Sequence, residues 1–106
     1  MTEQKIQNEI ILAINQRGHR LFRANAGKVI TRDNRVIKLL PKGFPDTFGY
    51  RKSDGKFIAI EVKTESGRLR PEQKKFKAFA ETQNILYGVA RSVEDAIEIV
   101  EGTQKT

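Results

Sequence analysis

Residues 43–63 read GFPDTFGYRKSDGKFIAIEVK, and this stretch decides the expected fold. Two short runs of strand-forming residues flank the turn signal Ser-Asp-Gly at 53–55, which predicts a β-hairpin. Because side chains alternate along a strand, Glu61 and Lys63 project from the same face. A hairpin returns its second strand to the level where the first begins, so Asp46 is expected beside Glu61. Two carboxylates and one ammonium group should therefore converge at one end of a small sheet.

This convergence suits a hard divalent cation with a water bound beside it. Mg²⁺ is the expected cofactor, and Mn²⁺ is expected to substitute for it. The expected protein ligands are Asp46, Glu61 and the backbone carbonyl of Val62. The alternative is that Glu61 and Lys63 form only a structural ion pair at a strand end. The run at 57–60 is nearly all apolar, so charges emerging from that strand are costly unless something pairs them.

The ordered set of short motifs resembles the virus-type replication–repair nuclease (VRR-NUC) domain of the PD-(D/E)xK nuclease superfamily. That family shows a Glu in its first helix, then Asn-x-Gly, Gly-x-Pro-Asp, an E-x-K strand, and a helix with a Gln. The corresponding residues here are Glu9, Asn25-Ala26-Gly27, Gly43-Phe44-Pro45-Asp46, Glu61-Val62-Lys63 and Gln73. The resemblance spans about residues 3–90. It implies a restriction-endonuclease-like fold of the α/β class, with a small mixed sheet flanked by helices.

The resemblance also implies roles for two residues outside the hairpin. It places Glu9 at the metal site, whereas spacing alone favours an exposed Glu9 that pairs with Lys5. It gives Gln73 the role of positioning Lys63 or the substrate, although a structural Gln at a helix start is common. The candidate catalytic residues are therefore Glu9, Asp46, Glu61, Lys63 and Gln73, and Glu9 is also a candidate metal ligand.

Periodicity and capping signals predict the order α-β-β-β-β-β-α-β-α within a single domain over residues 1–106. Helices are expected at 2–17, 71–84 and 92–102, and strands at 19–25, 29–31, 36–40, 47–50, 56–63 and 85–90. The strand at 85–90 should pair in parallel with the E-x-K strand, because a helix connects them. The hairpin at 29–40 need not belong to the central sheet. It could contact either DNA or a second subunit.

Positive charge is concentrated in the middle of the chain. Residues 17–77 hold 17 of the 20 Lys and Arg but only 6 of the 13 Asp and Glu. Such a basic region attracts phosphate backbones, although it could also serve only solubility. The candidate DNA-binding residues are Asn25, Lys28, Lys42, Arg68, Arg70 and Lys74. The turn that contains Asn25 could instead be needed only for loop geometry.

These observations predict a Mg²⁺-dependent DNA endonuclease that acts on branched DNA, such as four-way (Holliday) junctions, as a homodimer in DNA repair. The alternatives are a non-catalytic basic DNA-binding module and a sequence-specific restriction-type nuclease. The chain has no Cys, no apolar run near the roughly 20 residues of a membrane span, and no signal-peptide pattern in MTEQKIQNEI. We therefore expect the cytoplasm of a bacterial or phage-infected cell.

Overall fold

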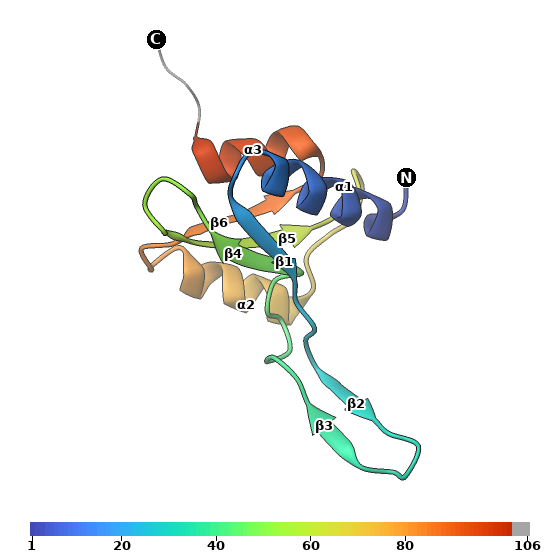
Figure 1. Cartoon of the computed structure of the whole chain (residues 1–106). Helices are drawn as coiled ribbons and strands as arrows, with labels where there is room; N and C mark the ends of the chain where they lie inside the picture. The colour runs from blue at the N-terminus through green and yellow to red at the C-terminus, as the bar shows by residue number, and fades with distance from the viewer. Residues whose placement is uncertain (103–106) are drawn as a thin grey trace.

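The centre of the molecule is a mixed four-stranded sheet, seen in a computed structural model that describes residues 1–102 (Figure 1). In sheet order the strands are β1 (Arg20–Arg23), β4 (Thr47–Tyr50), β5 (Phe57–Val62) and β6 (Leu86–Ala90). The β1–β4 and β4–β5 pairs are antiparallel, whereas β5 and β6 run parallel. The predicted α/β class and the predicted parallel partner of the E-x-K strand are therefore confirmed.

Three helices cover the two faces of this sheet. α1 (Glu3–Gln16) and α3 (Val93–Glu101) lie on one face, and α2 (Pro71–Ala80) lies on the other (Figure 1). The core fills the face under α1 and α3, and its buried residues are Ile6, Ile10, Ile14, Leu21, Ile58, Ile60, Val62, Ala90, Ala96 and Val100. Because side chains alternate along β5, Glu61 points to the opposite face, toward α2. Within residues 1–102, no helix is both long and apolar enough to cross a membrane.

The helix boundaries follow the capping signals in the sequence, with one exception. Thr2 caps α1 by accepting a hydrogen bond from a first-turn N–H (3.1 Å), and Ser92 caps α3 by accepting the Asp95 N–H (3.1 Å). α2 ends at Ala80, although the sequence predicted a helix to residue 84. The chain tightens there, because Gln83 donates its N–H to the Ala80 carbonyl three residues back (3.0 Å).

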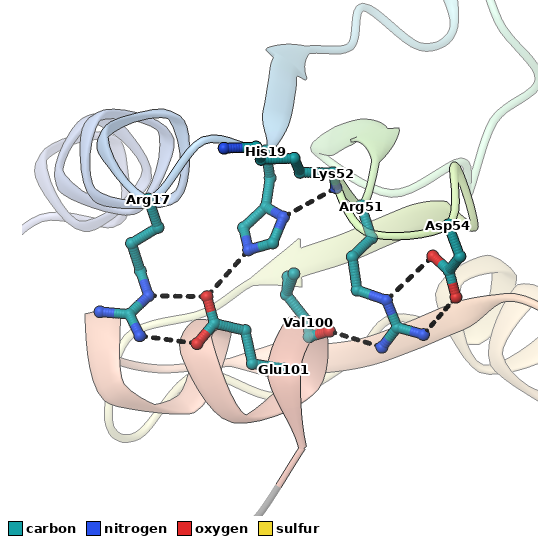
Figure 2. Close-up of polar contacts among 7 residues, drawn as sticks. All are labelled: Arg17, His19, Arg51, Lys52, Asp54, Val100 and Glu101. Atoms are coloured by element: carbon teal, nitrogen blue, oxygen red, sulfur yellow. Dashed lines mark hydrogen bonds and ion pairs between the residues drawn. The ribbon is translucent and has the colours of Figure 1, made fainter.

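The turn at 53–55 joins β4 to β5, as predicted. The Arg51 N–H donates to the Lys56 carbonyl (2.9 Å) and closes the turn. The Arg51 guanidinium binds both carboxylate oxygens of Asp54 (3.1 and 2.6 Å) and the Val100 carbonyl (2.9 Å), as Figure 2 shows. The hairpin that carries the E-x-K strand is therefore anchored to α3.

The segment between β1 and β4 forms an arm (residues 28–38) that projects from the body of the molecule (Figure 1). Its strands, β2 (Lys28–Ile30) and β3 (Val36–Lys38), form a separate two-stranded antiparallel sheet. Every residue of both strands is exposed. The predicted hairpin at 29–40 therefore exists outside the central sheet, although its second strand ends at Lys38 rather than at residue 40.

A polar cluster ties the C-terminal ends of α1 and α3 to the start of β1 (Figure 2). Glu101 accepts two hydrogen bonds from Arg17 (2.8 and 2.6 Å), and it lies 2.8 Å from Nε2 of the buried His19. Nδ1 of His19 accepts the Lys52 N–H (3.0 Å), so the ring proton sits on Nε2 and is donated to Glu101. His19 is therefore a structural residue whose two ring nitrogens are both satisfied.

We expect Glu101→Gln to lower stability near neutral pH and to make stability less sensitive to acid. Hydrogen bonds from Arg17 and then His19 lower the pKa of Glu101 from 4.5 to about 2. Its contribution is therefore full above pH 4.5 and is lost as the pH falls to about 2. Because Glu101 is exposed, the loss at pH 7 should be only about 0.5–1 kcal/mol. Urea unfolding at pH 7 and pH 3 measures it, with Glu65→Gln as an exposed control. Equal acid sensitivity of wild type and E101Q would contradict this assignment.

Candidate active site

The two carboxylates of the predicted site lie side by side at the end of the β4–β5 hairpin. The register pairs Thr47 with Ile60, which makes Asp46 and Glu61 the next residues along the two strands. Asp46 Oδ2 accepts the Val62 N–H (2.8 Å), so its side chain is held against β5. The sequence prediction that Asp46 lies beside Glu61 is correct.

A tight turn before Asp46 sets the position of this carboxylate. Gly43 has φ +94°, and a Cβ added there would lie 2.6 Å from the Glu72 carbonyl oxygen. Only glycine combines this backbone conformation with such close packing against the first turn of α2. The turn therefore fixes the spacing between the Pro45-Asp46 pair and α2.

Glu61 is a buried carboxylate that is only partly satisfied. Its side chain is 1% exposed, and its Oε1 accepts a hydrogen bond from Gln73 Nε2 (3.2 Å). Its Oε2 receives no hydrogen bond from any donor in residues 1–102. Buried polar atoms nearly always have a partner, so an oxygen without one indicates a place where an ion or water binds.

The pKa of Glu61 is raised from 4.5 to about 9. Burial is the largest cause, followed by a hydrogen bond with Asp46 and by repulsion from the Asp46 charge, while the Lys63 charge acts in the opposite direction. Two carboxyl groups share a hydrogen bond only when one of them holds a proton. A state in which Asp46 and Glu61 are both ionised is therefore unfavourable unless a proton or a cation lies between the two carboxylates.

Lys63 follows on the same strand face as Glu61 and is 6% exposed. Its N–H donates to the Ala90 carbonyl (3.0 Å), which extends the parallel β5–β6 pairing up to the site. A lysine this deeply buried is stabilised by nearby negative charge. Glu61 interacts electrostatically with Lys63, whose charge lowers the Glu61 pKa, although within residues 1–102 no carboxylate lies within ion-pair distance of the Lys63 ammonium.

Gln73 lies in the first turn of α2, faces the sheet and is 3% exposed. Its Oε1 accepts the Arg70 N–H (2.8 Å), which leaves the Nε2 group to donate to Glu61. Its side-chain hydrogen bonds within the described residues therefore hold Glu61. The resemblance had implied that Gln73 positions Lys63 or the substrate.

Glu9 lies on the exposed side of α1, as helical spacing alone predicted. The buried side of α1 runs through Ile6, Gln7, Ile10 and Ile14, and Glu9 is exposed. A place for Glu9 at the metal site stays a prediction from the resemblance. In residues 1–102 there is no group of three or more His, Cys, Asp or Glu side chains arranged to hold a metal ion.

Among the acids of α1, Glu3 raises the pKa of Glu61, as the smallest of the causes of that shift. Spacing provides a signal for it, because Glu3 stands three, four and seven residues before Ile6, Gln7 and Ile10. It therefore shares the helix face that is directed at the sheet.

The donor set fits a hard divalent cation. Asp46 and Glu61 supply oxygen ligands, and Glu61 Oε2 is buried without a donor. A cation there would remove the repulsion that raises the pKa of Glu61. Mg²⁺ commonly binds through one or two carboxylates and keeps several waters, so a pair of acids is sufficient. The Val62 carbonyl remains a predicted third ligand.

A cleft of about 590 Å³ opens beside Asp46. Three candidate DNA-binding residues line it, namely Lys28, Lys42 and Arg70. The other three candidates, Asn25, Arg68 and Lys74, are exposed outside this lining. The base of the arm and the start of α2 thus place positive charge next to the carboxylate pair.

Arg91 is a residue of this region that sequence reasoning missed. Its Nη1 donates to the carbonyls of Thr64 (2.7 Å) and Gly67 (2.6 Å) in the loop after Lys63. The contact joins the end of β6 to a loop 24–27 residues away in sequence. No local pattern identifies such a contact, because a single Arg after a strand is common.

Comparison with known proteins agrees with this geometry. No curated protein matches the chain. A family description, the VRR-NUC domain, matches residues 2–94. The matched residues include the β4–β5 hairpin, the first turn of α2 and the base of the arm. Since the match covers most of the sequence, this chain belongs to the VRR-NUC domain family, a nuclease family of the PD-(D/E)xK type.

Proposed function

We propose that this protein is a divalent-metal-dependent DNA endonuclease that hydrolyses phosphodiester bonds. The observation that carries the proposal is the pairing of the half-buried Asp46 with the buried Glu61, which has one oxygen that lacks a donor. Lys63 lies on the same strand face as Glu61, and the cleft beside Asp46 is lined by basic residues, Lys28 and Lys42 among them. Acidic ligands next to a basic cleft suit a metal ion and a phosphate backbone together.

The residues divide into three roles in this proposal. Asp46 and Glu61, with the Val62 carbonyl, hold Mg²⁺ or Mn²⁺. When bound, the ion polarises a phosphate oxygen and lowers the pKa of bound water. Lys63 stabilises the negative charge that grows on the phosphate in the transition state. Gln73 is a positioning residue, since it acts through Glu61.

A cleavage assay tests the proposal directly. Labelled linear duplex, flap, four-way junction and single-stranded DNA are incubated with the protein in Mg²⁺, in Mn²⁺ or in EDTA. We expect cutting in either metal and none in EDTA. DNA binding without cutting in any metal would overturn the proposal and would favour the non-catalytic binding module.

We expect the working unit to be a homodimer that cuts four-way junctions in pairs. A single site cuts one strand, so paired cuts need two sites, and two-fold symmetry is the commonest arrangement of oligomers. The sheet face beside α2 exposes Phe22, Tyr50 and Phe57, and α2 itself exposes Phe79, by 38–58%, which offers apolar surface to a partner. The basic cleft favours contacts to the DNA backbone, and hence recognition by shape.

Two measurements check this expectation. Light scattering at micromolar concentration should give about twice the chain mass of 12.1 kDa. Cuts on a four-way junction should fall at symmetrically paired positions. A monomeric mass, or equal cutting of junction and linear duplex, would contradict it.

A further inference from the structure

The arm (residues 28–38) exposes apolar side chains on both of its faces. The exposed fractions are 46% for Val29, 65% for Ile30, 56% for Val36 and 48% for Ile37. An isolated two-stranded hairpin is only marginally stable in water. The arm therefore presents a surface suited to a partner.

One face of the arm combines this apolar surface with two unpaired lysines. The register places Lys28 opposite Lys38 and Ile30 opposite Val36, and alternation puts both pairs on the same face. Like charges directly opposite each other destabilise a strand pair. Neither lysine forms an ion pair within residues 1–102. An anion bound between them would turn this repulsion into attraction.

The charge of the segment selects among possible partners. Residues 28–42 carry five basic residues and a single acid, Asp33. Asp33 already accepts a hydrogen bond from Thr31 and pairs with Arg35 (3.1 Å). A second copy of the arm would add more positive charge to the same place. A polyanion would neutralise it.

The base of the arm is part of the candidate active site. Lys28 from the arm, and Lys42 just beyond it, line the same cleft as Asp46. A strand rises about 3.3 Å per residue, so the arm reaches at most roughly 16 Å from Lys28 to its tip at Asp33. A two-stranded ribbon fits the major groove of DNA, which is about 12 Å wide. DNA held at Asp46 would therefore pass along the arm.

We propose that the arm is a DNA-binding ribbon that reads the branch point of the substrate. Lys28 and Lys38 bind a backbone phosphate between them. Ile30 and Val36, on the same face, contact bases that are unstacked where DNA strands part, as apolar wedges do in other DNA-bending proteins. This proposal deepens the proposed function, because it rests on DNA being the substrate of the Asp46 cleft.

Paired variants of the two faces test the proposal. The double variant Ile30→Thr/Val36→Thr removes apolar surface from the lysine face but keeps β-branched side chains. Val29→Thr/Ile37→Thr makes the same change on the opposite face and is the matched control. Fluorescence anisotropy in EDTA, which prevents cutting, measures the affinity for a four-way junction and for a linear duplex.

We expect Ile30→Thr/Val36→Thr to weaken junction binding by about tenfold or more and duplex binding by less than about threefold. The control should change both affinities by less than about threefold. Lys38→Gln should weaken both DNAs alike and lower the salt slope of binding by about one. Circular dichroism and light scattering should give the wild-type fold and mass for every variant.

Three results would overturn the proposal. They are unchanged junction binding in Ile30→Thr/Val36→Thr, an equal loss in the control, or a lower mass, which would make the arm a subunit contact. The nuclease function is judged separately, by metal-dependent cutting with wild-type protein. If the wild-type protein cuts DNA and Ile30→Thr/Val36→Thr binds junctions as the wild type does, only the proposed role of the arm is rejected. Binding without cutting rejects only the nuclease activity.

Discussion

Replacing Glu61 with glutamine is expected to reduce metal-dependent cleavage below about one-thousandth of the wild-type rate. The amide keeps the shape of the side chain, and its oxygen can still accept the hydrogen bond from Gln73 Nε2. It lacks the negative charge that a divalent cation needs. Asp46→Asn should behave in the same way, because Asp46 is the other carboxylate of the pair. Single-turnover cleavage of a labelled junction at saturating protein measures both rates.

DNA affinity and stability should be unchanged or higher in both variants. Neither amide adds a charge that repels phosphate, and Glu61→Gln removes a buried carboxylate whose pKa is raised mainly by burial. Glu65→Gln, in the exposed loop after the site, is the matched control and should cut normally. Near wild-type cutting by Glu61→Gln or Asp46→Asn would show that the pair does not hold the catalytic metal. Loss of folding in a metal-free buffer would instead contradict the account of Glu61 burial.

The carboxylate pair could be predicted from sequence because a hairpin fixes its own register. The turn signal at 53–55 sets which residues of β4 and β5 face each other, and alternation with period two sets which face each side chain takes. The strand register and the side-chain faces are both set locally, so one short stretch of sequence is enough to predict that Asp46 lies beside Glu61. The contact between Gln73 and the sheet was predictable in direction, because the apolar spacing of α2 placed Gln73 on its inner side.

The parts that could not be predicted depend on contacts between distant segments. The position of the α1 acids relative to Glu61 depends on how α1 packs on the sheet, and helical spacing alone does not set it. His19 contacts Glu101, which lies 82 residues further along the chain, and no local sequence pattern near either residue predicts this contact. The arm is a different case. Its two strands could be predicted from the sequence. Whether they join the central sheet depends on tertiary packing, which the sequence pattern did not determine.

Lys63→Met is expected to lower the cleavage rate by about a hundredfold to a thousandfold, with little change in DNA affinity. Methionine fills the buried space, so the fold should persist. The ammonium group acts mainly when negative charge grows on the phosphate, which is why its loss appears in the rate rather than in binding. Single-turnover rates at saturating protein, beside anisotropy in EDTA, separate these two effects.

Two controls distinguish this role from the alternatives. The dependence of the cleavage rate on Mg²⁺ concentration separates an effect on metal affinity from an effect on the chemical step. A rate restored by higher Mg²⁺ would therefore assign Lys63 to metal affinity and would contradict a role in the transition state. Lys74→Ala, an exposed residue of α2, should do the opposite of Lys63→Met, with weaker binding, a salt slope lower by about one and a normal rate at saturation. If Lys63→Met cut normally but bound weakly, Lys63 would be a contact to the DNA backbone like Lys74.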